Sequence, residues 1–528
     1  MIRVPAEPVG RHTDAWRHCV GTGRVELALR RDYQDSLALI QREIGFRHIR
    51  GHGLLSDGMG VYRPYDHEGA RRVHHAFTYV DQVVDAYLEA GLRPFVELGF
   101  MPQDLASGSQ TVFWWHGNVT PPRSYREWAD LVRAVVVHLV DRYGIDEVRT
   151  WPIEVWNEPN LPDFWQGADE TAYHRLYEVT AHAVKDVDAA LQVGGPAISP
   201  GADDWLERFA EFAEQREVPV DFVSKHAYSS GPAQHVPFGV HQTLAPASDL
   251  LDQFAAPRER LKGTRLADLP VHITEFNSSY RPDNPIHDTA FHAAYLAPVL
   301  AHGGDLADSF SYWTFSDMFE ETGVPTGLFH GGFGLLTHRQ VRKPTYHLYA
   351  FMARTGPDLL ARGDDHLVTR HPDGRVTVLA WAPVDPTGQT PGTGRHELRL
   401  SLPVATRGSL ETRRSGVRTD QETEGDREVG EVQQVFVRRS SVDEERGNAY
   451  TTWRHMGSPR SPKPAQLDVL HQAAEPARSH CRLPVRQGRA ELNLVLACHE
   501  ITFVELTPVA DETPPWWDER RLLGRAAP

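Results

Sequence analysis

The sequence predicts an α/β protein in which a (β/α)8 TIM barrel is followed by a C-terminal β-sandwich domain. Short apolar runs alternate with longer segments of helical periodicity over residues 15–354, and eight such pairs are the number in a (β/α)8 barrel. From residue 355 onward the pattern changes to short β runs separated by turn residues, as in antiparallel sandwiches. The 528 residues exceed one domain of roughly 100–200 residues, so the chain has room for both.

The barrel strands are predicted from runs rich in β-branched and aromatic residues, and the helices from their apolar periodicity. The helix before Gly91 ends in Glu-Ala-Gly, a common helix stop. A doubly wound open sheet is the alternative, but Gly21-Thr22-Gly23 lacks the third glycine of its phosphate loop. The predicted strands are 16–20, 46–50, 94–98, 152–156, 192–197, 222–227, 271–276 and 309–315. The predicted helices are 33–44, 79–90, 125–143, 171–187, 203–214, 250–261, 288–302 and 345–353.

The second domain is predicted over residues 355–510, with residues 1–14 as a further part of it. The run 407–431 is rich in charged residues and poor in apolar ones, which predicts a mobile loop. Residues 511–528 form a tail that carries Trp516 and Trp517 among charges and prolines. The predicted sandwich strands are 366–370, 376–381, 396–402, 491–496 and 501–506.

The composition excludes several classes of protein. Asp and Glu number 71 against 55 Lys and Arg, and a net charge of −16 disfavours binding to nucleic acid, which requires an excess of cations. Three scattered cysteines are too few for a disulfide framework or a zinc site. The first residues lack the basic and apolar regions of a signal peptide, and no apolar run is long enough to span a membrane. We therefore expect a cytoplasmic enzyme with no membrane partner.

Polar and aromatic side chains follow the predicted barrel strands. In a (β/α)8 barrel the active site lies at the carboxyl ends of the strands, so these side chains are expected to converge on one mouth. Two carboxylates there suit glycoside cleavage, because one donates a proton to the leaving oxygen while the other attacks the anomeric carbon or activates water. The converging residues are His52, Asn157, Glu158, His226, Tyr228, Glu275 and Trp313.

The neighbours of the two carboxylates fit the same chemistry. Asn157 supplies an amide for a sugar hydroxyl next to the anomeric centre. Trp313, Trp115 and Phe164 offer apolar faces on which a sugar ring can stack. The charge of Glu275 is expected to raise the pKa of Glu158 and keep it protonated.

Several motifs resemble glycoside hydrolase family 39, specifically its bacterial β-xylosidases. The resemblance extends over most of residues 15–355 and, more thinly, to about residue 507. The two central motifs are Glu154-Val-Trp-Asn-Glu-Pro-Asn160 and Ile273-Thr-Glu-Phe-Asn-Ser-Ser279. Further matching segments begin at Gly51, Arg93, Gly117, Ser309, His330 and Asp443.

The resemblance implies a retaining exo-acting β-D-xylosidase in which Glu158 is the acid/base and Glu275 the nucleophile. The two carboxyl groups are then expected roughly 5–5.5 Å apart. The resemblance also implies a xylo-oligosaccharide substrate and a homo-oligomer, either dimer or tetramer. It places His52, Asn157, His226, Tyr228, Trp313, Glu320 and Glu321 around the terminal sugar.

Two other functions compete with this interpretation. Another retaining enzyme of the family, such as an α-L-iduronidase, would require basic residues near the terminal sugar, whereas Glu320 and Glu321 favour a neutral sugar. A catalytically silent carbohydrate-binding barrel would not need both carboxylates. Glu97 is interpreted as a structural residue of the barrel. No metal-binding spacing occurs, so no metal and no cofactor are predicted, and the chain has no Gly-x-Ser-x-Gly motif of a serine hydrolase.

Overall fold

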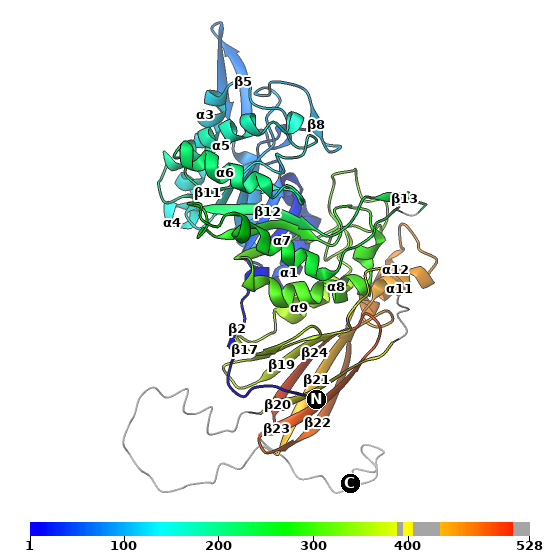
Figure 1. Cartoon of the computed structure of the whole chain (residues 1–528). Coiled ribbons are helices and arrows are strands. Elements are labelled where there is room, and N and C mark those ends of the chain that lie inside the picture. Colours follow the sequence, from blue (N-terminus) through cyan, green and yellow to red (C-terminus); the bar gives the residue numbers. More distant parts are fainter. Residues whose placement is uncertain (238, 388–393, 405–432, 510–528) are drawn as a thin grey trace, which may run out of the picture.

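The structure is a computed structural model of the chain, and it describes residues 1–237, 239–387, 394–404 and 433–509 (Figure 1). Eight strands, all paired in parallel, close into a barrel. In order around the barrel they are β10 (Pro152–Val155), β11 (Gln192–Ile198), β12 (Phe222–Tyr228), β15 (Val271–Asn277), β16 (Ser309–Tyr312), β3 (Cys19–Arg24), β4 (His48–His52) and β7 (Arg93–Leu98).

Helices cover the outside of the barrel (Figure 1). Local sequence fixes several of their ends: Ser124, Asp169 and Thr289 each cap a helix by accepting a backbone N–H bond. Gly91 follows the second helix in a left-handed conformation with φ +79°. The helices are α1 (Arg31–Glu43), α2 (Thr78–Glu89), α3 (Tyr125–Tyr143), α4 (Ile145–Val148), α5 (Glu170–Lys185), α6 (Asp204–Gln215), α7 (Ala247–Arg260), α8 (Ala290–His302) and α9 (Pro344–Met352).

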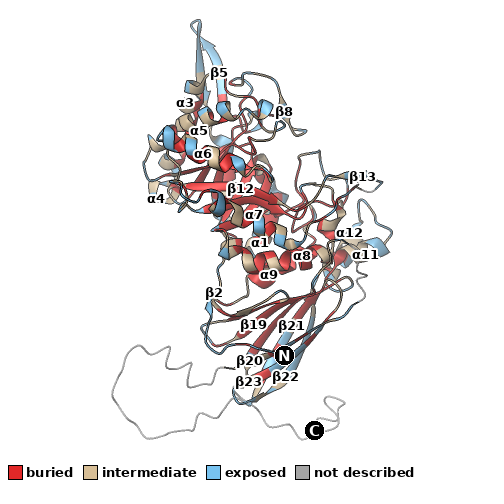
Figure 2. Cartoon of the chain, viewed as in Figure 1, coloured by how far each residue is buried: buried red, intermediate tan, exposed pale blue. Residues whose placement is uncertain are grey.

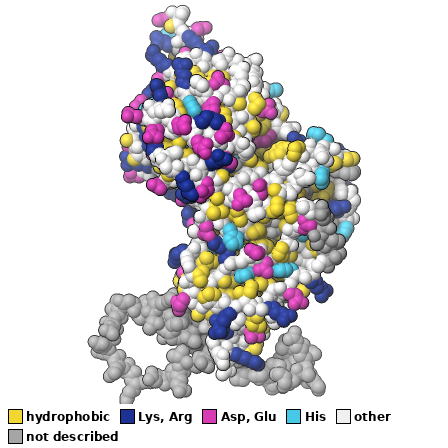
Figure 3. Space-filling model, in the orientation of Figure 1, with side chains coloured by type: hydrophobic (Ala, Val, Ile, Leu, Met, Phe, Trp, Pro, Cys, Tyr) yellow, Lys and Arg dark blue, Asp and Glu magenta, His cyan; other side chains and the backbone are white. Residues whose placement is uncertain are grey.

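The segments that follow the barrel strands carry short helices and hairpins. The hairpin β5–β6 projects from the barrel (Figure 1), and basic side chains gather near that end of the visible face (Figure 3). The hairpins are β5 (Tyr62–His67) with β6 (Ala70–His75), β8 (Thr111–Val112) with β9 (Gly117–Asn118), and β13 (Gln234–Val236) with β14 (Gly239–His241). The 3-10 helices are Ala15–Arg17, Val25–Leu29, Asp57–Met59, Gln166–Ala168, Pro285–Asp288 and Gly303–Asp305.

The second unit is a ten-stranded sheet that curls around its own apolar core. That core includes Val368, Val378, Leu400, Leu494 and Val504, all buried. Both N-terminal strands belong to this sheet and form its two edges. In order the strands are β1 (Ile2–Arg3), β20 (His396–Pro403), β23 (Arg489–Leu496), β22 (Ala477–Arg486), β21 (Gln434–Val442), β24 (Ile501–Pro508), β19 (Val376–Trp381), β18 (His366–Arg370), β17 (Asp358–Arg362) and β2 (Gly10–Arg11).

The barrel and the sheet pack against each other. Phe351 of α9 stacks on Phe503 of β24 at a ring-centroid distance of 5.6 Å. Two helices between β21 and β22, α11 (Ala449–His455) and α12 (Pro464–Ala473), pack on Leu328 and Phe329 of the segment that follows β16. The second unit therefore contacts a segment that reaches the barrel mouth.

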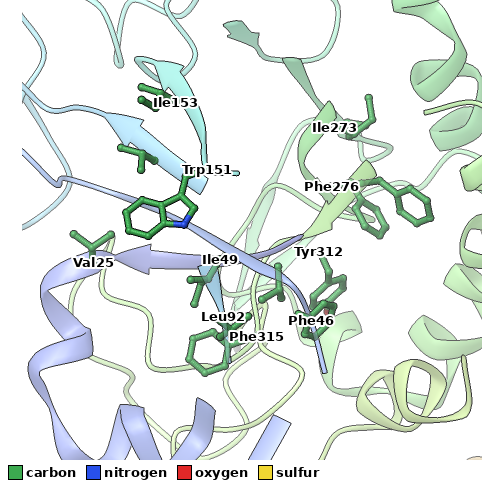
Figure 4. Packing of buried hydrophobic residues seen from close by; sticks show 14 of the residues in the cluster. Val25, Phe46, Ile49, Leu92, Trp151, Ile153, Ile273, Phe276, Tyr312 and Phe315 are labelled. Atoms are coloured by element: carbon green, nitrogen blue, oxygen red, sulfur yellow. The ribbon is translucent and has the colours of Figure 1, made fainter. Parts of the chain in front are cut away.

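A large apolar core lies inside the barrel wall and under its helices (Figure 2). Figure 4 shows how Ile49, Ile153, Ile273, Phe276 and Tyr312 project into it from strands β4, β10, β15 and β16. Fully burying a side chain of this size contributes roughly 1.5–3 kcal/mol. This core holds the strand ends in fixed relative positions, which is what a site assembled from several strands requires.

The predicted fold class is confirmed, and the differences are local. Residues predicted as the first strand begin instead with the 3-10 helix Ala15–Arg17, and β3 starts at Cys19. Strands β21 and β22 and the hairpin β5–β6 were not predicted. Most residues of β22 are exposed, so its sequence lacks an apolar alternation. The predicted loop 407–431 and tail 511–528 lie outside the described residues. None of the described helices has the length and apolar character needed to cross a membrane.

Candidate functional site

A cavity of about 560 Å³ opens at the carboxyl ends of the barrel strands. Its volume lies within the range of small-molecule sites. Glu158 and Glu275, from opposite parts of the barrel wall, both line it. The lining residues are His52, Asn157, Glu158, Leu161, Asp163, Phe164, Ser199, Pro200, Tyr228, Ser230, Glu275, Tyr280, Arg281, Trp313, Glu321 and Phe333.

The backbone that carries Glu158 is in an unusual conformation. Strand β10 ends at Val155, and Trp156 and Glu158 then adopt positive φ angles of 71° and 44°. Such conformations cost about 1–3 kcal/mol for a residue other than glycine and persist only where the surroundings enforce them. Here the Trp156 indole donates to the Phe164 carbonyl, and the Glu158 N–H donates to the Ala197 carbonyl. These bonds hold the turn that directs Glu158 into the cavity.

The two carboxylates lie close together. An oxygen of Glu158 and an oxygen of Glu275 are within 4.8 Å of each other. His226 Nδ1 lies 2.9 Å from Glu158 Oε1 and 3.5 Å from Glu275 Oε2. The separation is near the roughly 5–5.5 Å of retaining glycosidases and below the roughly 6.5–9.5 Å of inverting ones.

Burial and the neighbouring charge of Glu275 raise the pKa of Glu158 well above its usual value. Burial and the nearby Arg50 charge hold the pKa of His226 well below 6.5, so this imidazole is neutral. A neutral imidazole adds no positive charge that would favour the ionised form of Glu158. Glu158 is therefore suited to carry a proton at neutral pH.

Glu275 has a different environment. Burial raises its pKa, but the Arg50 guanidinium, His52 and the Tyr228 hydroxyl oppose this effect. Arg50 Nη1 donates to Glu275 Oε1 at 2.8 Å, and the Tyr228 hydroxyl donates to Oε2 at 2.7 Å. Both bonds stabilise the carboxylate. Of the two groups, Glu275 is the one placed to be ionised and Glu158 the one placed to be protonated.

Arg50, fully buried in β4, joins the acidic residues beneath the cavity. Its guanidinium contacts Glu154 at 2.6 Å, Glu97 at 3.0 Å and Glu275 at 2.8 Å. It also donates to Asn157 Oδ1 at 2.9 Å, which leaves the Asn157 NH2 group for a substrate hydroxyl. Buried charges are tolerated only when they are paired and hydrogen-bonded. The positive charge of Arg50 thus offsets the cost of burying the carboxylates of Glu97, Glu154 and Glu275 close together.

Glu97 orients His52 rather than facing the cavity. His52 Nδ1 lies 2.7 Å from Glu97 Oε2. The opposite nitrogen, Nε2, is then directed at the site, 3.6 Å from Glu275 and 3.7 Å from Glu321. Burial and the charges of Glu275 and Glu158 raise the pKa of Glu321 well above its usual value. A protonated Glu321 can donate a hydrogen bond to a sugar.

Most of the predicted site residues line the cavity, and three lie elsewhere. His226 is fully buried beneath Glu158 and contacts the carboxylates rather than the open space. Trp115 packs on the Phe113 ring at 5.4 Å and is not among the lining residues. The predicted residues that line the cavity are His52, Asn157, Glu158, Phe164, Tyr228, Glu275, Trp313 and Glu321.

Glu320 is directed away from its neighbour Glu321. Its carboxylate pairs with Arg24 at 3.2 Å and with Arg30 at 3.1 Å, and it does not line the cavity. Both oxygens are therefore occupied by guanidinium groups rather than left for a sugar. The contacts of Glu320 fit a role in anchoring the segment that carries Glu321.

Several residues of the site were not predicted. Arg50 was missed because a single arginine in an apolar strand gives no motif, although a charge there signals a buried partner. Tyr280 and Arg281 directly follow the Ile273–Ser279 motif, and that adjacency was the only available signal. Ser199 and Ser230 lie just beyond β11 and β12, where any polar residue of a barrel can reach the mouth.

One group of described residues could hold a metal ion by geometry: Glu158, His226 and Glu275. The same three groups are the carboxylate pair and the imidazole that orients it. Their hydrogen bonds and the raised pKa of Glu158 also suit acid–base chemistry. The absence of a metal and a cofactor stays a prediction.

Comparisons with known proteins agree with this geometry. A family model described as "Glycosyl hydrolases family 39" matches residues 1–405. A β-xylosidase of Geobacillus stearothermophilus is 46% identical over 97% of this chain and 96% of its own length. The crystal structure of a monomeric β-xylosidase from Caulobacter crescentus CB15 superposes with a TM-score of 0.83, at 31% identity over 96% of this chain and 99% of that chain. Human α-L-iduronidase is 30% identical over only 29% of this chain and 22% of its own length.

Proposed function

This chain belongs to glycosyl hydrolases family 39, and on that premise we propose that it is a retaining exo-acting β-D-xylosidase. It releases xylose from the non-reducing end of xylo-oligosaccharides. The observation that carries the proposal is the buried carboxylate pair, in which burial and the charge of Glu275 raise the pKa of Glu158. The β-xylosidase of G. stearothermophilus, similar over nearly the whole chain, supports the choice of sugar.

The reaction proceeds by two displacements. In the first, a Glu275 oxygen forms a bond to the anomeric carbon while the glycosidic bond breaks, and the Glu158 proton moves to the departing oxygen. In the second, Glu158 takes a proton from water, the water oxygen bonds to the same carbon, and the Glu275 carboxylate is released. Xylose leaves with its original configuration.

The remaining contacts bind and orient the terminal sugar. Asn157 donates its amide to the hydroxyl beside the anomeric carbon, where such bonds strengthen in the transition state. Trp313, whose ring lies 4.8 Å from the His52 ring, supplies an apolar face. Tyr228 positions the nucleophile through its hydroxyl. His52 and Glu321, which line the same cavity, offer polar groups to the sugar hydroxyls.

The charges of the cavity favour a neutral sugar over an iduronide. Arg281 is the one arginine or lysine among the described lining residues, and Asp283 pairs with it. A sugar carboxylate would instead face Glu321 and the catalytic pair. The second candidate, a catalytically silent barrel, does not explain why the pKa of one carboxyl is raised beside a stabilised partner.

A panel of nitrophenyl glycosides tests the substrate. We expect kcat/KM for the β-D-xyloside to exceed that for the β-D-glucoside by on the order of 10- to 200-fold, the discrimination that one additional group in a closed pocket gives. The arabinoside and the α-L-iduronide serve as comparisons. A higher kcat/KM for any of these three would exclude the β-xylosidase. A complete lack of turnover on all four would favour the silent barrel.

The pH dependence of kcat/KM follows from the two carboxyl groups. The active form has Glu158 protonated and Glu275 ionised, so activity falls on the acid side as Glu275 takes a proton and on the basic side as Glu158 loses one. Because burial raises both pKa values, we expect both limbs above the ordinary carboxyl value of roughly 4.3. A rate profile for xylobiose over pH 3–10 measures this. An acid limb below roughly pH 4 would contradict the upward shift of Glu275.

Two features of the biological setting also belong to the proposal. The free cysteines Cys19, Cys481 and Cys498 fit a reducing compartment, so we place the enzyme in the cytoplasm, acting on imported products of xylan degradation. We also propose that the protein forms a homo-oligomer, either a dimer or a tetramer, although the β-xylosidase of C. crescentus is a monomer. Light scattering of the purified protein distinguishes these states.

A further inference from the structure

The cavity has a closed end and an open end. His52, Trp313 and Phe333 are at most 2% exposed, whereas Tyr280, another lining residue, is 45% exposed, so we assign the first three to the closed end and Tyr280 to the open end. In an exo-acting enzyme the terminal sugar occupies the closed end, so the rest of the substrate extends through the open end. The residues of the open end therefore face the leaving group.

Tyr280 is fixed in place despite its exposure. It lies in the segment after β15, and its hydroxyl accepts a hydrogen bond from the Ala233 N–H in the segment after β12, at 3.2 Å. Because Tyr280 is 45% exposed, part of its ring has no packing partner within the described residues. An exposed aromatic ring that is hydrogen-bonded through its hydroxyl at the mouth of a sugar site is a surface for stacking.

A buried glutamine ties together the two segments that hold Tyr280. Gln242 is 7% exposed, and its Oε1 accepts from Ser279 Oγ and from Asn284 Nδ2. Its Nε2 donates to Ser230 Oγ at 3.0 Å and to the Gly231 carbonyl at 2.8 Å. The two acceptor positions and two donor hydrogens of the amide are all used. The two segments around Tyr280 are thus joined by four hydrogen bonds of one buried side chain.

Polar groups surround the aromatic ring. Arg281 lines the same end, and Asp283 holds its guanidinium through Nε and Nη2 at 3.0 and 3.1 Å. Phe164, from the segment after β10, adds a second aromatic ring to the lining. Aromatic faces with a few oriented polar groups are what a sugar ring requires, because it presents C–H faces and hydroxyl edges.

From this arrangement we propose that Tyr280 is the platform of a subsite for the sugar on the leaving-group side of the scissile bond. The inference rests on the proposed function and extends it to the substrate class: oligosaccharides of neutral sugars rather than xylosides with small leaving groups. In the second displacement the same subsite holds an acceptor sugar. The acceptor hydroxyl gives its proton to Glu158, its oxygen bonds to the anomeric carbon, and Glu275 is released.

The test compares two substrates in wild type and in Tyr280→Ala. Xylobiose fills the leaving-group subsite, whereas in β-D-xylosyl fluoride the leaving group is too small to reach it. We expect the ratio of kcat/KM for xylobiose to that for the fluoride to fall by roughly 10-fold, mainly through KM, since stacking acts on bound substrate and transition state alike. Transfer of xylose to added xylobiose should fall in parallel.

Two controls accompany the variant. Tyr280→Phe keeps the ring and should retain most of the ratio. Tyr65→Ala removes another exposed tyrosine, on the hairpin β5–β6, and should leave the ratio as in wild type. If Tyr280→Ala lowers kcat/KM equally for xylobiose and for the fluoride, Tyr280 has a structural role. The inference is then overturned, while the proposed function stands. If wild type hydrolyses neither substrate, the proposed function itself is overturned, and the inference with it.

Discussion

Replacing Glu275 with alanine is expected to lower kcat for xylobiose by roughly 10⁴- to 10⁶-fold, the range found when one member of a catalytic unit is removed. Glu275 is placed to attack because Arg50 and Tyr228 stabilise its carboxylate, at 2.8 and 2.7 Å. No other described group both lines the cavity and has such support for its charge. The measurement is a steady-state rate on xylobiose, with the unfolding temperature confirming that the variant is folded. Arg50 keeps Glu97 and Glu154 as partners, so its charge remains paired.

Added azide should restore turnover to Glu275→Ala and give a product of inverted configuration. The truncated side chain leaves room for a small anion on the face from which the carboxylate attacked, so a single displacement replaces two. Glu275→Gln is the matched control, because the amide fills this space and should prevent rescue. If Glu275→Ala keeps appreciable activity without azide, the nucleophile lies elsewhere, and Glu321 would be the next carboxylate to replace because it lines the same cavity.

The barrel and the position of Glu158 and Glu275 at its mouth could be predicted because their signals are local. Each barrel strand is a short apolar run, and Glu158 and Glu275 each lie within a motif of consecutive residues. The contacts of Arg50 could not be predicted in this way, since its bond to Glu275 joins residues 225 positions apart. Only the closed barrel brings such residues together.

Assignments made from adjacency were less reliable. Their adjacency predicts that Glu320 and Glu321 act as a pair. In the structure Glu320 instead contacts Arg24 and Arg30, whereas Glu321 lines the cavity. Trp115 lies beside the site without lining it, because its ring packs on Phe113. Tyr280 lies in a segment without periodicity, so its position depends on hydrogen bonds to other loops that the sequence does not reveal.

For Glu158→Ala we expect a loss that depends on the leaving group. Xylobiose requires a proton on its departing oxygen, so kcat/KM should fall by roughly 10²- to 10⁴-fold, the contribution of a general acid. A dinitrophenyl xyloside leaves without a proton, so its kcat/KM should change much less. The variant should also lack the basic limb that the wild-type kcat/KM profile shows on xylobiose, because that limb reports the ionisation of Glu158.

Azide distinguishes the roles of the two carboxylates in a single product analysis. In Glu158→Ala the covalent xylosyl intermediate on Glu275 still forms but lacks the base that activates water, so it accumulates. Azide needs no base and attacks the intermediate from the side of the lost Glu158, which gives xylosyl azide of retained configuration. Glu275→Ala is instead expected to give the xylosyl azide of inverted anomeric configuration. Two results would mean that Glu158 is not the acid/base. One is an azide product of inverted configuration from Glu158→Ala, and the other is an equal loss of kcat/KM for xylobiose and for the dinitrophenyl xyloside. Glu158→Gln provides the control for altered packing, because it keeps the side-chain volume next to His226, which lies 2.9 Å from Glu158 in the native protein.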